Sequence, residues 1–217
     1  LNIYAHKDME LFLDPFIKYF GNQFPYKINL VPLDPHQHRL IFENNAIRVH
    51  SFPLKHRIPT NGFLFEEKER PRHIKREMID FYNIPVGKIN EIKQGADFAA
   101  DDGRWIKNEV LTTPSTPPRA YAYCSDTAFS TEIIPYIQRS DVLYHEATFA
   151  EAENMRAQET HHSTARQAAE IAKAANVRKL IIGHYSSRYN ELDKLLDEAR
   201  AVFPETELAD EGMTINL

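Results

Sequence analysis

The sequence has a single cysteine, Cys124, among its 217 residues. One cysteine excludes an internal disulfide and any cysteine-rich zinc site. The chain also lacks an uninterrupted apolar run of about eighteen residues, the length that a membrane-spanning helix requires. We therefore expect a cytoplasmic protein with no membrane partner. Any metal ion would be held by carboxylates and by some of the ten histidines.

An excess of positive charge is missing as well. Lysine and arginine number 26 and aspartate and glutamate 31, which gives a net charge of −5. A protein that binds nucleic acid usually has a basic surface, so an RNA partner would require positive charge that is concentrated locally. The first residue is Leu1 and not methionine, so the absence of a signal peptide is uninformative.

The hydrophobic pattern predicts an α/β fold with layered packing. Expected strands cover 1–4, 28–33, 40–42, 46–52, 62–65, 120–124, 142–145 and 179–183, with a short strand pair at the end of the chain. Expected helices cover 8–20, 74–82, 131–138, 163–175 and 190–202. From 119 onward strands and helices alternate, which is typical of a sheet covered by helices.

The stretch 66–118 differs in amino-acid composition from the rest of the single domain expected over 1–217. It is rich in charge, has few large apolar residues and ends in a Thr/Ser/Pro linker at 112–118. We interpret it as an inserted arm and a candidate RNA-binding exosite. Its candidate phosphate contacts are Arg70, Arg72, Lys75, Arg76 and Lys88. For each of these residues a solvated charged loop is an equally good interpretation.

Chemically capable side chains follow three of the expected strands. Asp126, His145-Glu146 and His184 come where α/β sheets place ligand and catalytic groups. His162 precedes an expected helix for which Ser163 is a plausible N-cap. Taken singly, each has an ordinary structural explanation, such as a turn, a cap or a surface ion pair. Together, a carboxylate and imidazoles would suit zinc, and a second carboxylate–imidazole pair would suit proton transfer.

Five motifs occur in a fixed order along the chain. They are the loop histidine His56, Ser125-Asp126-Thr127, His145-Glu146-Ala147-Thr148, His162-Ser163-Thr164 and His184-Tyr185-Ser186-Ser187-Arg188-Tyr189. In this order they resemble the motifs of ribonuclease Z, a family of the metallo-β-lactamase superfamily. The resemblance covers essentially the whole chain. It implies an αβ/βα sandwich and a homodimeric, zinc-dependent endoribonuclease that removes the 3′ trailer from precursor tRNA.

The resemblance also implies roles for individual residues. His56 would ligate one zinc ion and His184 a second, with Asp126 bridging the two and taking part in catalysis. Glu146 would orient and charge His162, which would protonate the departing 3′ oxygen or steady the phosphate. Substrate phosphate would be held by Arg188, Ser186 and Tyr189.

One expected motif is absent. The family's His-x-His-x-Asp-His loop has no counterpart, and His36-Gln37-His38 is followed by Arg39-Leu40 instead of Asp-His. We interpret His36 and His38 as surface or turn histidines. The resemblance then predicts an incomplete sandwich without its first strands and metal loop. It also predicts a fragment that is inactive and binds less than the two zinc ions per subunit of the intact enzyme.

Two alternatives remain open at this stage. The first is another phosphodiesterase or hydrolase of the metallo-β-lactamase fold, which would cleave a small phosphodiester but not precursor tRNA. The second is a metal-free RNA-binding or structural derivative of the fold.

Overall fold

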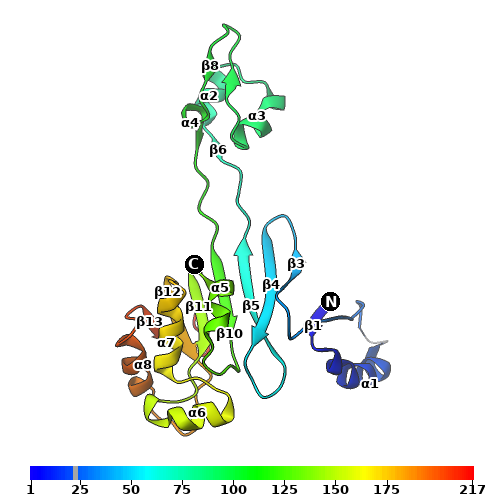
Figure 1. The fold of residues 1–217 in the computed structure, drawn as a ribbon. Coiled ribbons are helices and arrows are strands. Elements are labelled where there is room, and N and C mark those ends of the chain that lie inside the picture. The colour runs from blue at the N-terminus through cyan, green and yellow to red at the C-terminus, as the bar shows by residue number, and fades with distance from the viewer. Residues whose placement is uncertain (22–23) are drawn as a thin grey trace. The chain divides into compact units, whose positions relative to one another are not determined.

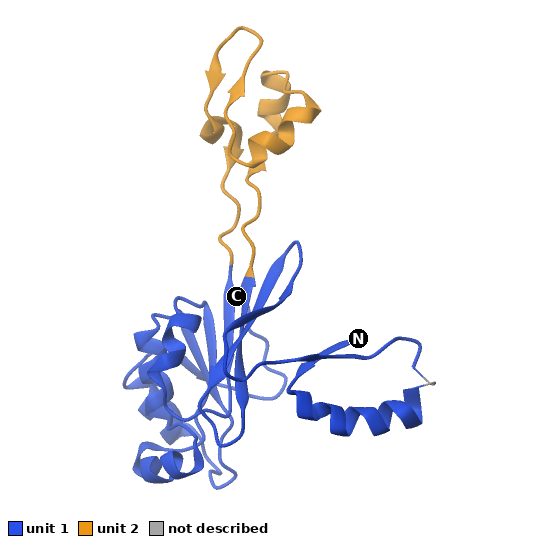
Figure 2. Cartoon of the chain, turned by 45° about the vertical axis from the view of Figure 1, so that its right-hand side comes forward, with its two compact units in different colours: residues 1–66, 119–217 blue, residues 67–118 orange. Residues whose placement is uncertain are grey.

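A computed structural model describes residues 1–21 and 24–217, which form two compact units (Figures 1 and 2). Unit 1 comprises residues 1–66 and 119–217, and unit 2 comprises residues 67–118. Among the described helices, none combines the length and apolar character needed to span a membrane.

Unit 1 is built on a seven-stranded sheet with the strand order β13-β12-β11-β10-β5-β4-β3. These strands are β3 (Arg39–Glu43), β4 (Ile47–Leu54), β5 (Thr60–Glu67), β10 (Ala120–Cys124), β11 (Val142–Glu146), β12 (Lys179–Gly183) and β13 (Thr206–Leu208). Neighbouring strands from β10 to β13 run parallel, whereas β5 is antiparallel to β10 and β3 to β4. A separate parallel pair joins β1 (Asn2–Ala5) to β2 (Asn29–Pro32).

Most helices of unit 1 come between consecutive parallel strands along the chain. They are η1 (Lys7–Met9), α1 (Glu10–Phe20), η3 (Thr131–Ile133), α5 (Ile134–Ile137), η4 (Glu151–Glu153), α6 (Asn154–Thr160), α7 (Ala165–Ala174) and α8 (Asp193–Arg200). Helix α7 begins with a capping box in which the Thr164 hydroxyl accepts the amide of Gln167. The prediction of Ser163 as its N-cap was therefore wrong by one residue, and the reason lies in the site described below.

The core of unit 1 lies between α7, α8 and the parallel strands (Figure 1). Helix α7 presents a face of buried alanines, among them Ala168 and Ala172, which allows close packing against the sheet. The run Leu180–Ile182 in β12 is fully buried, as expected for a strand covered on both faces. This packing fixes the ends of the parallel strands, from which the polar side chains of the site project.

The end of the chain differs from the sequence prediction. A strand pair was expected there, but β13 is the last strand and it joins the sheet edge parallel to β12. After the Ala209 amide, which still binds the Ile182 carbonyl, the chain makes a turn at 210–213 in which Gly212 has φ 79°. Within the described residues no further strand follows Leu208, so the expected second strand is not formed.

Unit 2 has a hydrophobic core of its own. Its elements are β6 (His73–Ile74), α2 (Arg76–Phe81), α3 (Val86–Lys93), β7 (Phe98–Ala99), β8 (Trp105–Ile106), α4 (Asn108–Leu111) and β9 (Thr112–Thr113). The core consists of Ile84, Ile92, Phe98, Ile106 and Leu111. The few apolar residues of the expected arm therefore converge in one small core.

Candidate metal centre

Three adjacent parallel strands bring the site residues to one edge of the sheet. Asp126 follows β10 by two residues, Glu146 ends β11 and His184 directly follows β12. The strand register pairs Glu146 with Gly183, the residue before His184. Asp126 and His184 both have φ 60°, in the left-handed region that side chains other than glycine rarely adopt. Such conformations persist where the surrounding structure holds them, and they are concentrated at functional sites.

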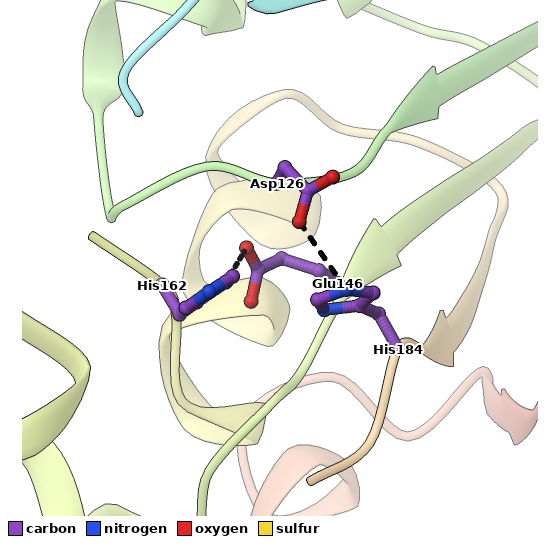
Figure 3. Close-up of side chains that lie close together, drawn as sticks. All are labelled: Asp126, Glu146, His162 and His184. Atoms are coloured by element: carbon purple, nitrogen blue, oxygen red, sulfur yellow. Dashed lines mark hydrogen bonds and ion pairs between the residues drawn. The ribbon is translucent and has the colours of Figure 1, made fainter. Parts of the chain in front are cut away.

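Four of the predicted site residues form one cluster. Asp126, Glu146, His162 and His184 each offer a ligand atom within 4.8 Å of the others (Figure 3). The Nε2 atom of His184 lies 3.2 Å from Oδ1 of Asp126. The ring of His162 stacks on that of His184 at 5.2 Å, and the ring of His56 lies 5.0 Å from that of His162. The loop histidine thus lies beside the cluster.

The carboxylate of Glu146 is fully buried and saturated with hydrogen bonds. Its Oε1 accepts the Thr127 amide at 2.6 Å and Nδ1 of His162 at 2.8 Å. Its Oε2 accepts the Thr148 hydroxyl at 2.6 Å and the Ser163 amide at 3.1 Å. Because four protein donors occupy its oxygens, Glu146 organises the site and is not a free ligand. The Ser163 hydroxyl, which a helix cap would use, is instead directed to the Thr127 carbonyl at 2.7 Å, and the cap falls on Thr164.

Electrostatics make Glu146 and His162 a charged pair. Burial alone raises the pKa of the Glu146 carboxyl, but hydrogen bonds from His162, Thr148 and the Ser163 amide outweigh it and leave the pKa lowered. The hydrogen bond to Glu146 raises the pKa of His162, against a smaller opposing effect of burial. The arrangement therefore favours an imidazolium beside a carboxylate, poised to give up a proton from Nε2.

The other two imidazoles are held through Nδ1 with Nε2 left for a ligand. The His161 carbonyl lies 2.9 Å from Nδ1 of His56, and because a carbonyl only accepts, that nitrogen carries the hydrogen. Nδ1 of His184 lies 2.9 Å from the Thr148 hydroxyl. Anchoring of one ring nitrogen by the protein is characteristic of metal-binding histidines.

The free donor atoms fit a divalent cation. They are a carboxylate from Asp126 and Nε2 of His184, 3.2 Å apart, together with Nε2 of His56, whose ring adjoins His162 but lies outside the metal-ligand group. Imidazole and carboxylate ligands suit Zn²⁺, and three protein ligands plus water are typical of a catalytic zinc ion. The donor chemistry of the cluster is therefore that of a metal centre.

The predicted phosphate ligands lie outside this cluster. Nη1 of Arg188 forms an ion pair with Oε1 of Glu153 at 3.3 Å. The Tyr189 hydroxyl donates to the same carboxylate and accepts the Ala150 amide. Ser186 uses its amide to bind the Thr148 carbonyl. In this structure the arginine and the tyrosine fasten the segment after β12 to η4.

The two histidines of the His-Gln-His segment lie elsewhere. The ring of His38 is largely exposed and stacks on His50 at 5.0 Å and on Tyr136 at 4.9 Å. The His36 amide binds the Asp34 carboxylate in a local turn. Neither belongs to the metal-ligand group found among the described residues.

Sequence reasoning did not foresee the three residues that hold Glu146. Thr127, Thr148 and Ser163, the last expected only as a helix cap, contribute two amides and one hydroxyl to that carboxylate. The sequence does contain a signal for Thr148, which lies two positions after Glu146. Residues two apart in an extended chain share a face. A threonine two positions after a catalytic carboxylate can therefore reach it.

Comparisons with known proteins agree with this architecture. A family model described as a beta-lactamase superfamily domain matches residues 92–185. The structure of human tRNase Z, short form, superposes with a TM-score of 0.57 at 20% identity, covering 99% of this chain and 67% of that one. The fold and the donor cluster define a protein of the metallo-β-lactamase superfamily.

Relatives in sequence narrow the assignment. Ribonuclease Z of Parabacteroides distasonis is 51% identical over all 217 residues, and that of Porphyromonas gingivalis is 48% identical. In each case this chain spans 71% of the relative's length. The chain belongs to the ribonuclease Z family of metal-dependent endoribonucleases.

Proposed function

We propose that the chain serves tRNA 3′ processing, as a zinc-dependent endoribonuclease that removes the 3′ trailer from precursor tRNA. Family membership supports the reaction class, and one observation carries the mechanism. The charged Glu146–His162 pair lies beside the Asp126–His184 donor group, so a proton donor and a cation site share one sheet edge.

The protein's own residues divide the chemistry between them. Bound zinc lowers the pKa of its water and stabilises the charge that develops on the phosphate. Asp126, His184 and His56 hold the cation. His162 donates the proton of Nε2 to the departing 3′ oxygen, and Glu146 keeps the imidazole charged until that transfer.

We propose zinc as the metal and two ions per subunit in the active enzyme, which Asp126, His56 and His184 would help to hold. The free donors of this cluster suffice for about one catalytic ion, which takes three protein ligands. The second ion therefore needs donors beyond the metal-ligand group described here.

Substrate contacts are proposed on both units. On unit 1, Arg188 would exchange its partner Glu153 for an RNA phosphate, with Ser186 and Tyr189 beside it.

On unit 2, the five predicted cations differ in availability. Arg70, Arg72, Lys75 and Lys88 each bond to a neighbour within the unit. Arg76 is exposed at the start of α2 and has no side-chain partner among the described residues. It is the strongest candidate for an RNA contact of the exosite.

We further propose that the protein is a homodimer, as the family resemblance implies. We also propose that it is located in the cytoplasm, because a single buried thiol suits a reducing compartment.

The test is cleavage of a precursor tRNA with a 3′ trailer by a zinc-loaded protein of the relatives' full length that includes this chain, because the chain by itself, which spans 71% of those relatives, is expected to be inactive. The proposal predicts a cut that leaves a 3′ hydroxyl on the tRNA and is lost in His162→Ala. The exposed Glu159→Gln is the matched control and should cleave normally.

Two other outcomes would reassign the protein. Hydrolysis of bis-p-nitrophenyl phosphate without any cleavage of precursor tRNA would favour another phosphodiesterase of this fold. A full-length protein that binds precursor tRNA but cleaves neither substrate would be an RNA-binding derivative.

A further inference from the structure

A cavity of about 370 Å³ lies beside the proton donor His162. Its walls come from three segments: the loop after β4, the loop after β10 and the region of α6 and α7. The lining residues are Lys55, Ala128, Phe129, Gln158, His161, His162 and Gln167. The volume falls in the range of small-molecule pockets, and none of the proposed zinc ligands lines it.

Several lining groups have no partner in the part of the chain that the structure describes. The ammonium of Lys55 and the imidazole of His161 make no side-chain hydrogen bond there. Gln158 donates its amide nitrogen to Asn154 and keeps its carbonyl oxygen unused. By contrast, both amide atoms of Gln167 are occupied, one by the capping box. The cavity thus offers a cation, an imidazole and an amide oxygen.

Phe129 adds an aromatic surface to these polar groups. Its side chain is 36% exposed and stacks on no other ring of the described residues. Covering this ring with an apolar or aromatic ligand surface would be favourable, because apolar area would leave water. Single-stranded RNA is recognised by stacking of its bases on aromatic rings, by hydrogen bonds to base edges and by cations on the phosphates. The cavity supplies all three kinds of group.

We propose that this cavity binds one nucleoside of the RNA, the one whose 3′ oxygen departs in the cleavage. The assignment rests on the proposed function, in which His162 protonates that oxygen. The base attached to the same ribose must lie close to His162, and this cavity is the hollow that His162 lines. In an in-line displacement the attacking water lies on the opposite side of the phosphorus. Phe129 would stack on the base, Gln158 would accept from its edge and Lys55 would meet the phosphate on its 5′ side.

The experiment is a binding cycle with RNA and the full chain. Precursor tRNA is prepared intact, with an abasic site at the nucleotide 5′ to the scissile phosphate, or with an abasic site at the nucleotide 3′ to it. Affinities are measured by fluorescence anisotropy in EDTA, so that the RNA stays uncut. The 5′ abasic site should weaken binding on the order of tenfold, and the 3′ abasic site should change it little.

Variants assign that effect to Phe129. Phe129→Ala should lose the penalty, binding intact and 5′-abasic RNA equally, whereas Phe129→Trp should retain it. Phe81→Ala removes an exposed phenylalanine of unit 2 and should also retain it. A tenfold penalty that persists in Phe129→Ala, or one that follows the 3′ nucleotide, would overturn the assignment while leaving the proposed function intact. A chain that binds no precursor tRNA would overturn both.

Discussion

The Thr148 hydroxyl lies 2.9 Å from Nδ1 of His184 and connects that imidazole to Glu146. Its single hydrogen is directed to Oε2 of Glu146 at 2.6 Å, so the oxygen accepts from His184. The buried carboxylate therefore acts on two imidazoles, on His162 directly and on His184 through the threonine. Both rings then keep Nε2 turned to the reacting centre.

Thr148→Val should weaken zinc binding by about 10–100-fold, the usual effect of removing a partner of a metal-binding histidine. Valine matches threonine in shape but leaves Nδ1 of His184 without an acceptor, so the ring no longer keeps Nε2 free for the metal. Competition with a chromophoric chelator measures the dissociation constant. Thr148→Ser restores the hydroxyl and should recover most of the affinity. Equal zinc affinity in the valine variant would show that the hydrogen bond has no part in metal binding.

Glu146→Gln should lower the free energy of unfolding by about 1–3 kcal/mol. A glutamine amide nitrogen cannot accept, yet each carboxylate oxygen faces two donors, for example Thr127 and His162 at Oε1. At the oxygen replaced by the amide nitrogen, two protein donors would lose their acceptor and would face a third donor, the NH₂ group of the glutamine. Urea denaturation of the metal-free chain measures the loss, and Glu159→Gln on the exposed surface of α6 should change stability very little. A variant as stable as the parent would mean that the hydrogen bonds to Glu146 are replaceable.

In the metal-free chain, the Glu146–His162 pair should stabilise the fold within a defined pH window. The pKa of His162 is raised above 6.5, so its contribution is complete below pH 6.5 and is lost as pH rises through the raised value. The pKa of Glu146 is lowered from 4.5, so its contribution is complete above pH 4.5 and is lost as pH falls through the lowered value. The pair is therefore fully effective between about pH 4.5 and 6.5.

Thermal melts of the metal-free parent and of Glu146→Gln across pH 4–9 test this window. The difference in melting temperature should be largest inside it and should shrink on the alkaline side. An NMR titration should place the imidazole pKa of His162 lower in the variant than in the parent. A His162 pKa that is equal in both proteins would contradict the pairing.

The parallel half of the sheet was predictable because its signals are local. The run 179–183 is a short apolar stretch between turns, and it forms β12 with those bounds. Polar residues after such strands predicted where Asp126 and His184 lie, since the carboxyl ends of parallel strands share one edge. Four of the residues that the family motifs selected, Asp126, Glu146, His162 and His184, lie within 4.8 Å of one another in the structure, whereas Ser186, Arg188 and Tyr189 lie outside this group.

What escaped prediction depends on contacts between distant segments. Either Ser163 or Thr164 could cap α7 by residue type, and the choice falls on Thr164 because the Ser163 hydroxyl is directed to the distant Thr127 carbonyl. In unit 2 the strands have only two residues each, too short for any periodicity to show. The convergence of Ile92 and Leu111 in one core is visible only after folding.

Leu111→Ala should unfold or loosen unit 2 while leaving the metal centre of unit 1 intact. The side chain is fully buried in the small core of unit 2, and such a deletion costs about 2–5 kcal/mol. Hydrogen exchange should rise in the amides of 67–118 and stay unchanged in α7 and β12. The neighbouring Val110→Ala, 44% exposed, is the matched control and should leave exchange unaltered.

Zinc affinity should be equal in Leu111→Ala and the parent chain, whereas affinity for precursor tRNA should fall if unit 2 is an RNA-binding exosite. Unchanged tRNA affinity together with increased exchange in 67–118 would show that unit 2 packs as an independent unit but is not an RNA-binding exosite.

Gly183→Ala should disturb the site because the added methyl group would collide with the side chain of Tyr144. The backbone conformation of Gly183 itself would accept an alanine. A Cβ atom at this position would lie 2.2 Å from the hydroxyl oxygen of Tyr144 and 2.6 Å from Cζ of that ring. Tyr144 is stacked on Tyr123 at 4.8 Å, so it has little freedom to withdraw. The strain would fall on the backbone of the next residue, the proposed zinc ligand His184.

We expect Gly183→Ala to lose about 1–3 kcal/mol of stability, the usual cost of overpacking, and to bind zinc more weakly than the parent. Gly87→Ala is the matched control, because a Cβ atom there meets nothing within 4 Å; it should leave zinc binding unchanged and should not destabilise the chain, since alanine favours helix α3. Urea denaturation and the chelator competition measure the two effects. The alanine variant could instead be destabilised but bind zinc like the parent. That result would mean that the Tyr144 ring moves aside, and that the hydrogen bond to Thr148 is enough to hold His184 in place.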